Sequence, residues 1–183
     1  MNISVVVPAV AEPITKDEAK LRSRIDGSAE DSLLDNLIAS ARDKAETNQN
    51  RKFMTQTLRL KLHCFHDEMA LPFPPLQSVT SITYVDPNGT TQTLATSVYE
   101  VDTTSEPGMI RLAHDQSWPD IRRQRAPAIQ ITFVVGYASA ADIPAPTKDA
   151  MLLYIDHRYR DRDGTKPIPE AFYNLLADNY WEG

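Results

Sequence analysis

The stretch from Ser28 to Thr47 limits the possible folds most, because its apolar residues repeat with the period of an α-helix. They would form one stripe along the helix, while the opposite face, which includes Glu46, is polar. A helix of this kind cannot bury its stripe alone, so the rest of the chain has to cover it. We therefore predict a helix over 28–47, capped by Ser28, whose buried stripe consists of Leu33, Leu34, Leu37, Ile38, Ala41 and Ala45.

A shorter helix is expected directly before it, at 15–25. Thr15 and Glu18 have the spacing of a capping box, in which each side chain accepts a hydrogen bond from the backbone N–H of the other residue. Leu21 and Ile25 are four residues apart and should share one face. The two helices are separated by a very short linker, which predicts that they pack as a pair.

The hydrophobic period changes to that of a β-strand between residues 56 and 137. Leu58, Leu60, Leu62 and Cys64 alternate with polar residues, which predicts a half-buried strand with Cys64 in the core. The turn sequence Asp86-Pro87-Asn88-Gly89 predicts a β-hairpin between its flanking segments. Further strands are expected at 98–101, 109–112 and 128–137.

The end of the chain returns to helical patterns. Thr147 is expected to cap a helix over 147–159, and a short helix should follow from Glu170 to Ala177. The last segment, 164–183, offers an apolar and aromatic surface, and two interpretations remain open. It packs on its own domain, or it docks on a partner through the candidate interface residues Phe172, Tyr173, Leu176, Tyr180 and Trp181.

These patterns predict an α+β fold. The N- and C-terminal helices pack together, and a small, mainly antiparallel β-sheet with a long loop is inserted between them. The expected organisation is an extended N-terminal arm at 1–12, a main domain at 13–163 and a C-terminal docking segment at 164–183.

Charge restricts the possible functions. The 183 residues carry a net charge of −6, which argues against a general nucleic-acid coat protein, and a single cysteine excludes an internal disulfide. No apolar run is long enough to span a membrane. Six acids and one base lie between Asp86 and Ile121, and the arginines Arg122, Arg123 and Arg125 follow at once. This is either a solvated loop with surface arginines or two complementary patches that meet on neighbouring subunits.

Two short motifs contain residue types that bind metal ions. His63, Cys64, His66 and Asp67 lie close together in sequence, but His63 and Cys64 would point to opposite faces of a strand, and we expect no zinc there. The second motif, residues 159–170, partly matches a calcium loop, with Asp161, Asp163, Gly164 and Glu170 at ligand or turn positions. Its first position is tyrosine, which favours an ordinary loop.

The sequence contains none of the common catalytic or phosphate-binding motifs, so we expect no enzyme and no cofactor. Two other functions are alternatives. The first is a small metal-dependent hydrolase. The second is a nucleic-acid-binding module that uses Arg122, Arg123, Arg125, Arg158, Arg160 and Arg162.

The order of several segments resembles the head–tail connector (adaptor) proteins of long-tailed bacteriophages and prophages. The resemblance covers about residues 13–164 and depends most on LPFPPLQSVTSI and on FVVGY followed by IPAP. It implies a structural virion protein at the head–tail junction, assembled in the bacterial cytoplasm. It also implies a ring of about a dozen copies below the portal protein, joined to a tail-side stopper or tail-completion protein. Packaged DNA would pass through such a ring without specific binding, and no membrane is involved.

Overall fold

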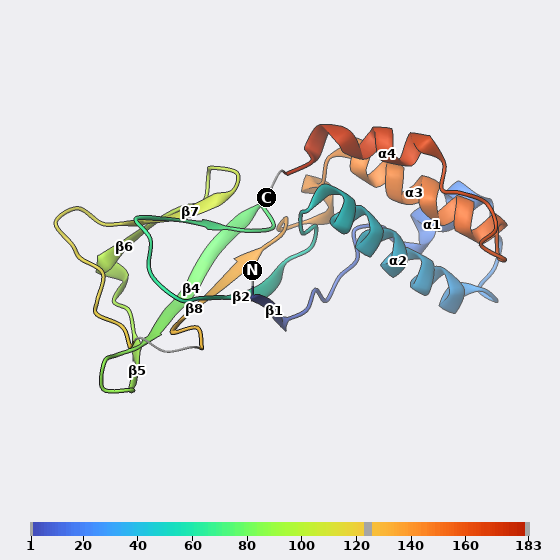
Figure 1. Ribbon diagram of the computed structural model, residues 1–183. Coiled ribbons are helices and arrows are strands. Elements are labelled where there is room, and N and C mark those ends of the chain that lie inside the picture. The colour runs from blue at the N-terminus through green and yellow to red at the C-terminus, as the bar shows by residue number, and fades with distance from the viewer. Residues whose placement is uncertain (1, 123–125, 182–183) are drawn as a thin grey trace. The chain divides into compact units, whose positions relative to one another are not determined.

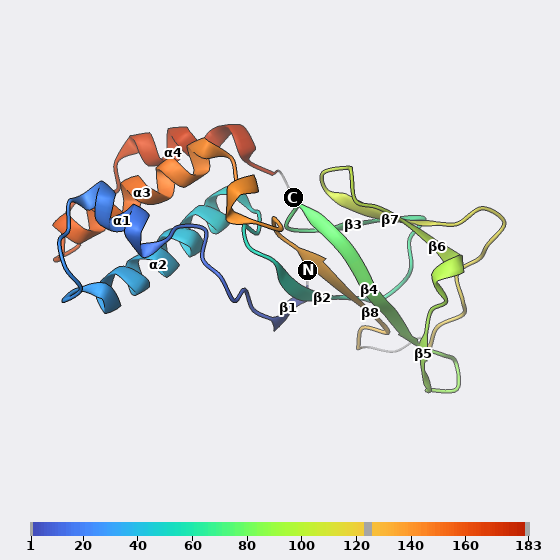
Figure 2. The same cartoon turned by 180° about the vertical axis from the view of Figure 1, so that it is seen from behind.

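The computed structural model describes residues 2–122 and 126–181 (Figure 1). The chain divides into two compact units. The sheet unit consists of Met1–Ala9 and Thr55–Gly136, and the helical unit of Val10–Met54 and Tyr137–Gly183. Each unit draws on segments that are far apart in sequence. The helices and the strands are therefore segregated, as Figure 2 shows from behind, and the expected α+β class is confirmed.

Among its described residues, the helical unit contains four α-helices and two short 3-10 turns. Helices α1, α2 and α4 all contact α3, and the core of the unit is formed where they meet it. The elements are α1 (Lys16–Ser23), α2 (Asp31–Gln49), η2 (Ala140–Asp142), α3 (Ala145–Arg160), α4 (Glu170–Leu176) and η3 (Ala177–Asn179).

The first helix begins as the sequence predicts, and the next two do not. The Thr15–Glu18 capping box is present at the start of α1. The prediction that Ser28 caps α2 is wrong, because Glu30 is the N-cap residue and makes no capping hydrogen bond through its side chain. Its carboxylate instead contacts Arg162, at 2.6 Å, and Tyr159. Long-range partners have therefore replaced a local cap.

Helix α3 also starts earlier than expected. Pro144 is its N-cap residue, and Thr147 is fully buried inside the helix rather than at its start. The Thr147 hydroxyl donates to the side chain of Gln49 in α2 at 3.4 Å. Helix α1 ends at Ser23, two residues earlier than predicted, so Ile25 lies outside the helix and does not share a helical face with the exposed Leu21.

The apolar stripe of α2 is present but narrower than predicted. Leu34, Ile38, Ala41 and Ala45 are buried, whereas Leu33 and Leu37 are only half-buried. Glu46, assigned above to the polar face, is buried instead. The reason is local: its carboxylate turns toward the chain that leaves the helix, where it finds partners in Lys52 and in the backbone of Phe53.

The described part of the sheet unit forms two antiparallel sheets. The larger has five strands in the order β1-β2-β8-β4-β5, and the smaller has the order β3-β7-β6. The predicted hairpin is confirmed by the pairing of β4 with β5. The strands are β1 (Asn2–Val7), β2 (Gln56–Leu62), β3 (Glu68–Leu71), β4 (Leu76–Val85), β5 (Thr91–Thr93), β6 (Tyr99–Asp102), β7 (Gly108–Leu112) and β8 (Ile129–Val135).

The two sheets share one hydrophobic core. Ile131 and Phe133 of β8 contribute to it from the larger sheet, and Met69 and Ile110 from the smaller one. The sequence pattern predicts one sheet, because β3 is only four residues long and has no clear strand signal of its own. The strands predicted at 98–101 and 109–112 are confirmed as β6 and β7, but with β3 they form a second sheet instead of joining the first.

The ends of the chain and the cysteine differ from expectation. Part of the predicted arm at 1–12 is β1, which pairs antiparallel with β2. The described residues of the segment 164–183 belong to the helical unit instead of forming a separate segment. Cys64 is exposed rather than in the core, because β2 ends at Leu62 and the apolar alternation continues past the end of the strand. None of the helices formed by described residues is both long and apolar enough to cross a bilayer.

Candidate interaction surfaces

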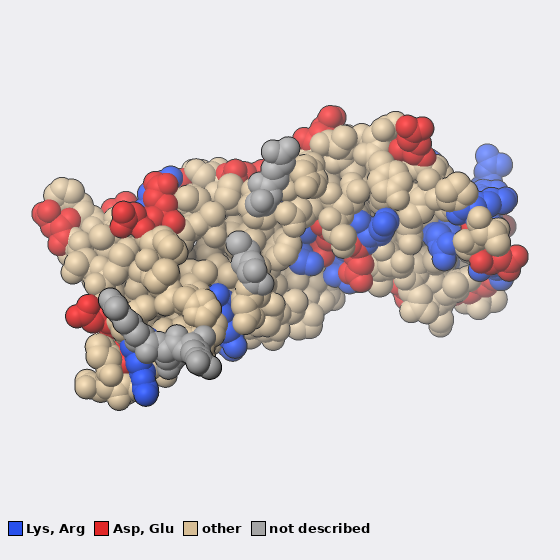
Figure 3. Space-filling view, viewed as in Figure 1, with Lys and Arg blue, Asp and Glu red and all other residues tan. Residues whose placement is uncertain are grey.

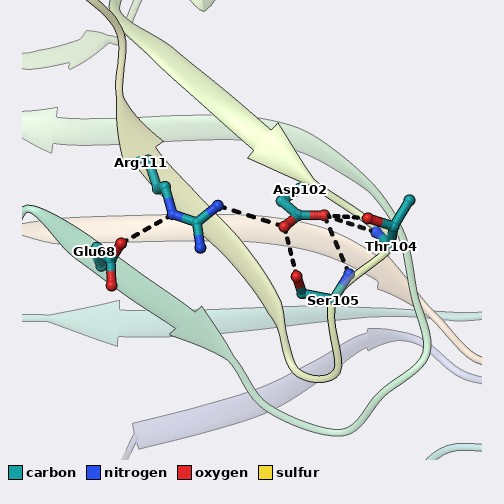
Figure 4. A network of polar contacts seen from close by, with 5 residues as sticks. All are labelled: Glu68, Asp102, Thr104, Ser105 and Arg111. Carbon is teal, nitrogen blue, oxygen red and sulfur yellow. Dashed lines mark hydrogen bonds and ion pairs between the residues drawn. The ribbon is translucent and has the colours of Figure 1, made fainter.

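A network of charged and hydroxyl side chains lies on the smaller sheet. The Arg111 guanidinium of β7 contacts Glu68 of β3 at 3.0 Å and Asp102 of β6 at 3.4 Å (Figure 4). Asp102 also accepts hydrogen bonds from the Ser105 hydroxyl at 2.6 Å and the Thr104 hydroxyl at 2.7 Å. The network joins all three strands and fixes the turn that leaves β6.

The network settles the charge state of its members. Hydrogen bonds from Ser105 and Thr104 hold the pKa of the Asp102 carboxyl well below its ordinary range. The hydrogen bond and charge of Glu68 raise the pKa of Arg111. The single base among the acids of this region is thus already paired within its own unit. Figure 3 shows acidic side chains gathered over β6 and β7, which leaves an exposed acidic surface around the network.

The structure describes one of the three arginines predicted to complement that acidic surface. The backbone N–H of Arg122 donates to the carbonyl of Val85 at 2.9 Å. Its guanidinium lies over Gly89 in the β4–β5 turn, where a Cβ atom would come within 2.6 Å of Nη1. Glycine at 89 therefore allows the arginine to cross the turn. Arg123 and Arg125 lie outside the described residues.

The C-terminal aromatic residues divide into buried and exposed sets. Phe172 and Leu176 are fully buried in the helical unit, where the Phe172 ring lies 5.6 Å from that of Tyr154 of α3. They are therefore not available to a partner, and this part of the candidate interface is corrected. Tyr173 and Tyr180 have 39% and 54% of their surface exposed, and Trp181 is half-buried.

Polar contacts tie this last segment to α2. The side-chain amide of Gln49 donates to the carbonyl of Leu176 at 2.9 Å, and the Gln49 carbonyl accepts from the Trp181 N–H at 3.1 Å. The Arg51 guanidinium donates to the carbonyl of Asn179 at 2.6 Å. The exposed tyrosines are thus held on a fixed scaffold, and interface anchors gain affinity from such pre-organisation.

The first strand, which the sequence predicts only as part of an extended arm, presents a second exposed apolar surface. Strand β1 is at the edge of its sheet, and Val5 and Val7 have 55% and 50% of their surface exposed. Val6 and Val10 are exposed as well. Edge strands of monomeric proteins usually carry charges or prolines that block further pairing, and β1 itself contains neither.

The two motifs considered for metals have other local roles. Cys64 and His66 are exposed, with Sγ and Nε2 3.3 Å apart, beside a cavity of about 590 Å³ that Lys61 also lines. The Asp161 carboxylate accepts from the Lys166 N–H at 3.0 Å and from the Thr165 hydroxyl, and the Lys166 hydrogen bond lowers its pKa. Within the described parts of the chain, no three His, Cys, Asp or Glu side chains are gathered as metal ligands would be.

The arginines of the second alternative function do not form one described cluster. Arg160 is paired with Asp156 at 2.9 Å and Arg162 with Glu30 at 2.6 Å, both within the helical unit. Arg122 belongs to the sheet unit. Paired arginines bind phosphates less readily, because an acid already occupies the guanidinium, so this set gives little support to a nucleic-acid-binding module.

Fold and surfaces together define a protein whose exposed features suit contacts with other proteins. Comparison with family models gives the same answer: residues 14–106, just over half of the chain, match the model of the phage gp6-like head-tail connector proteins. The chain belongs to this family. It is therefore a structural head–tail connector subunit and not an enzyme.

Solved structures with a similar fold come from gene transfer agent (GTA) particles. A chain from the neck of an empty GTA particle, computed with C6 symmetry, has a TM-score of 0.83 and 19% identity. It covers 98% of this chain and is itself covered to 95%. Chains from the virion of a native particle and from a native neck computed with C12 symmetry cover the same shares, with TM-scores of 0.79 and 0.74 and identities of 22% and 20%. No curated protein matches.

Proposed function

We propose that copies of this chain form a closed ring at the head–tail junction of a phage-like particle, assembled in the cytoplasm of a bacterial host. The ring lies between the portal protein and a tail-side stopper or tail-completion protein, and it extends the channel for packaged DNA. The observation that carries this proposal is the match over almost the whole chain to subunits of particle necks whose symmetry is C6 or C12. The proposed number of copies is about a dozen, which the C12 symmetry of one of these necks supports.

A cyclic ring needs two different complementary surfaces on each subunit, because its contacts run head to tail. The chain offers several candidates. The open edge of β1 with Val5 and Val7 is one, and the acidic surface over β6 and β7 is another. Arg122, with its neighbours Arg123 and Arg125, is the natural charge partner for that acidic surface on an adjacent copy.

The exposed C-terminal aromatic residues are assigned to the portal or to an adjacent subunit. Tyr173, Tyr180 and Trp181 combine apolar surface with a polar tip, which is the composition of interface anchors. Because the chain around them is held to α2, they would dock without a large loss of conformational entropy. The net charge of −6 disfavours tight retention of DNA, as suits a conduit.

The proposal is tested by inactivating the gene for this chain in a strain that produces the particles. Filled heads and separate tails should accumulate, and supplying the wild-type chain should restore joined particles. A Tyr173→Ala/Tyr180→Ala variant should restore them poorly, whereas Leu21→Ala, at an apolar site on α1 that is more exposed than either tyrosine, should restore them fully. Joined particles in the absence of the chain would contradict the proposal.

A further inference from the structure

The outer face of the five-stranded sheet differs in charge from the rest of the molecule. The chain has 25 acidic residues, yet none of the five strands contains an aspartate or a glutamate. Their only charged residues are Arg59 and Lys61, both on β2. Neither takes part in an ion pair among the described residues, unlike Arg42 and Arg111, which do.

The register places these two cations among hydroxyl and amide side chains. Their neighbours in strand, Leu58 and Leu60, point into the core, so Arg59 and Lys61 point outward. Across the sheet, Arg59 is in one row with Thr132 and Ser81, and Lys61 is in the next row with Gln130 and Thr83. All six side chains are partly exposed. The smaller sheet covers the opposite face, so within the sheet unit this face is open.

This composition fits one kind of partner. Arginine, lysine, serine, threonine and glutamine are the side chains that bind nucleic-acid phosphates, and a face without carboxylates does not repel a polyanion. The outward rows carry no aromatic ring on which a base would stack, and a sheet face has no helix to enter a groove. A contact between two copies of the chain would need a more apolar centre.

We infer that this face, which we call the Arg59–Lys61 face, lines the DNA passage of the ring and touches the phosphate backbone of the duplex. The inference rests on the proposed function and adds to it which surface meets the DNA. Two cations per copy make few phosphate contacts, so binding of the duplex is weak. Phosphate contacts are also independent of sequence. Hydroxyl and amide groups continue the surface between them, which suits a duplex that has to slide.

Photo-crosslinking in complete particles tests the inference. Thr132, in the middle of the face, is replaced by p-benzoylphenylalanine, and Ser78 of β4 gives a second, more exposed position in case the first variant folds poorly. Glu100 of β6, on the smaller sheet, is the control position. Irradiation should attach the chain to DNA from Thr132 or Ser78 and not from Glu100. Crosslinks to protein alone, or equal attachment from Glu100, would overturn the inference.

The contribution of the cations is measured on the purified full-length chain. Anisotropy of a labelled 30-base-pair duplex is followed while the salt concentration rises. An Arg59→Gln/Lys61→Gln variant should reduce the slope of log K against log salt by up to about 1.8, since each phosphate contact contributes about 0.9. The matched Arg22→Gln/Lys44→Gln variant, on the helices, should leave the slope unchanged. Equal slopes for wild type and the first variant, or no binding by either, contradict the inference.

The two proposals fail in different ways. Joined particles could contain about a dozen copies of the chain while the Arg59–Lys61 face crosslinks to a second copy. In that case the proposed ring is supported and the assignment of the face is wrong. If the chain is absent from the head–tail junction, the proposed function itself is wrong.

Discussion

Glu46 and Phe53 are joined by a buried hydrogen bond: a carboxylate oxygen of Glu46 accepts from the Phe53 N–H at 2.9 Å. The other oxygen contacts the Lys52 ammonium at 2.6 Å. Glu46 is in the last turn of α2, and Phe53 is fully buried just before the chain enters the sheet unit. This pair therefore fixes the path by which the chain leaves the helix.

Replacing Glu46 should destabilise the helical unit. In Glu46→Ala, the Phe53 N–H is left buried without its acceptor, which should lower the free energy of unfolding by about 1–3 kcal/mol. Asp43→Ala, which removes an exposed acid from the same helix, should change it by less than about 0.5 kcal/mol. Urea unfolding followed by circular dichroism compares the two. Equal losses would show that the Glu46 hydrogen bond has no special role.

The centre of the α2 stripe gives a second prediction. Ile38 is buried against the helical core, so Ile38→Ala should cost about 2–5 kcal/mol. Leu37→Ala should cost less, because Leu37 is only half-buried, and Asn36→Ala at an exposed position should cost well under about 1 kcal/mol. Thermal unfolding of the three variants tests this order. A larger loss for Asn36→Ala than for Ile38→Ala would mean that the helix is rotated.

The Asp102 network should make the stability of the sheet unit depend on pH. Hydrogen bonds from Ser105 and Thr104 lower the pKa of Asp102 in the folded protein. The contribution of Asp102 to the free energy of unfolding is therefore complete above the unfolded pKa of about 3.9, and it is lost as the pH falls below that value. Asp102→Asn removes the titrating group. The difference in unfolding midpoint between wild type and Asp102→Asn should thus be largest near neutral pH and shrink below about pH 4. A difference that is independent of pH would contradict this assignment.

Neighbouring aromatic residues in α4 should behave differently. Phe172 is fully buried, so Phe172→Ala should destabilise the helical unit by about 3–5 kcal/mol. Tyr173→Ala should change stability little, because its ring is partly exposed, and should act on particle assembly instead. Melting temperatures measure the effect on stability, and yields of joined particles measure the effect on assembly. If Phe172→Ala melted like wild type, the packing of α4 on α3 would be wrong.

Hydrophobic periodicity and local spacing were sufficient to predict the elements whose partners are close in sequence or whose pattern is long. The α2 stripe, the Thr15–Glu18 capping box and the Asp86–Gly89 hairpin turn all depend on local spacing. Strand β3 has four residues and no turn signal of its own, so its existence depends on pairing with β7, which is about forty residues away.

The errors at single residues have a common physical cause. Thr147 was assigned from the rules for capping residues and Glu46 from the polar pattern of its helix, and both are buried and hydrogen-bonded to residues outside their own helix. The predicted Ser28 cap of α2 is replaced by Glu30, whose carboxylate contacts Arg162. The C-terminal surface shows the same limit. Sequence marked Phe172 and Tyr180 as equally apolar and accessible, and only packing on α3 separates the core residue from the exposed one. The Arg59–Lys61 face became visible only when the strand register was known.

The central claim is that this chain forms a ring at the head–tail junction, and counting its copies tests that claim most directly. Purified particles should be digested and quantified by mass spectrometry with isotope-labelled peptides of this chain and of the portal protein. The account predicts about a dozen copies per particle, equal to or close to the portal number. One or two copies per particle would contradict it.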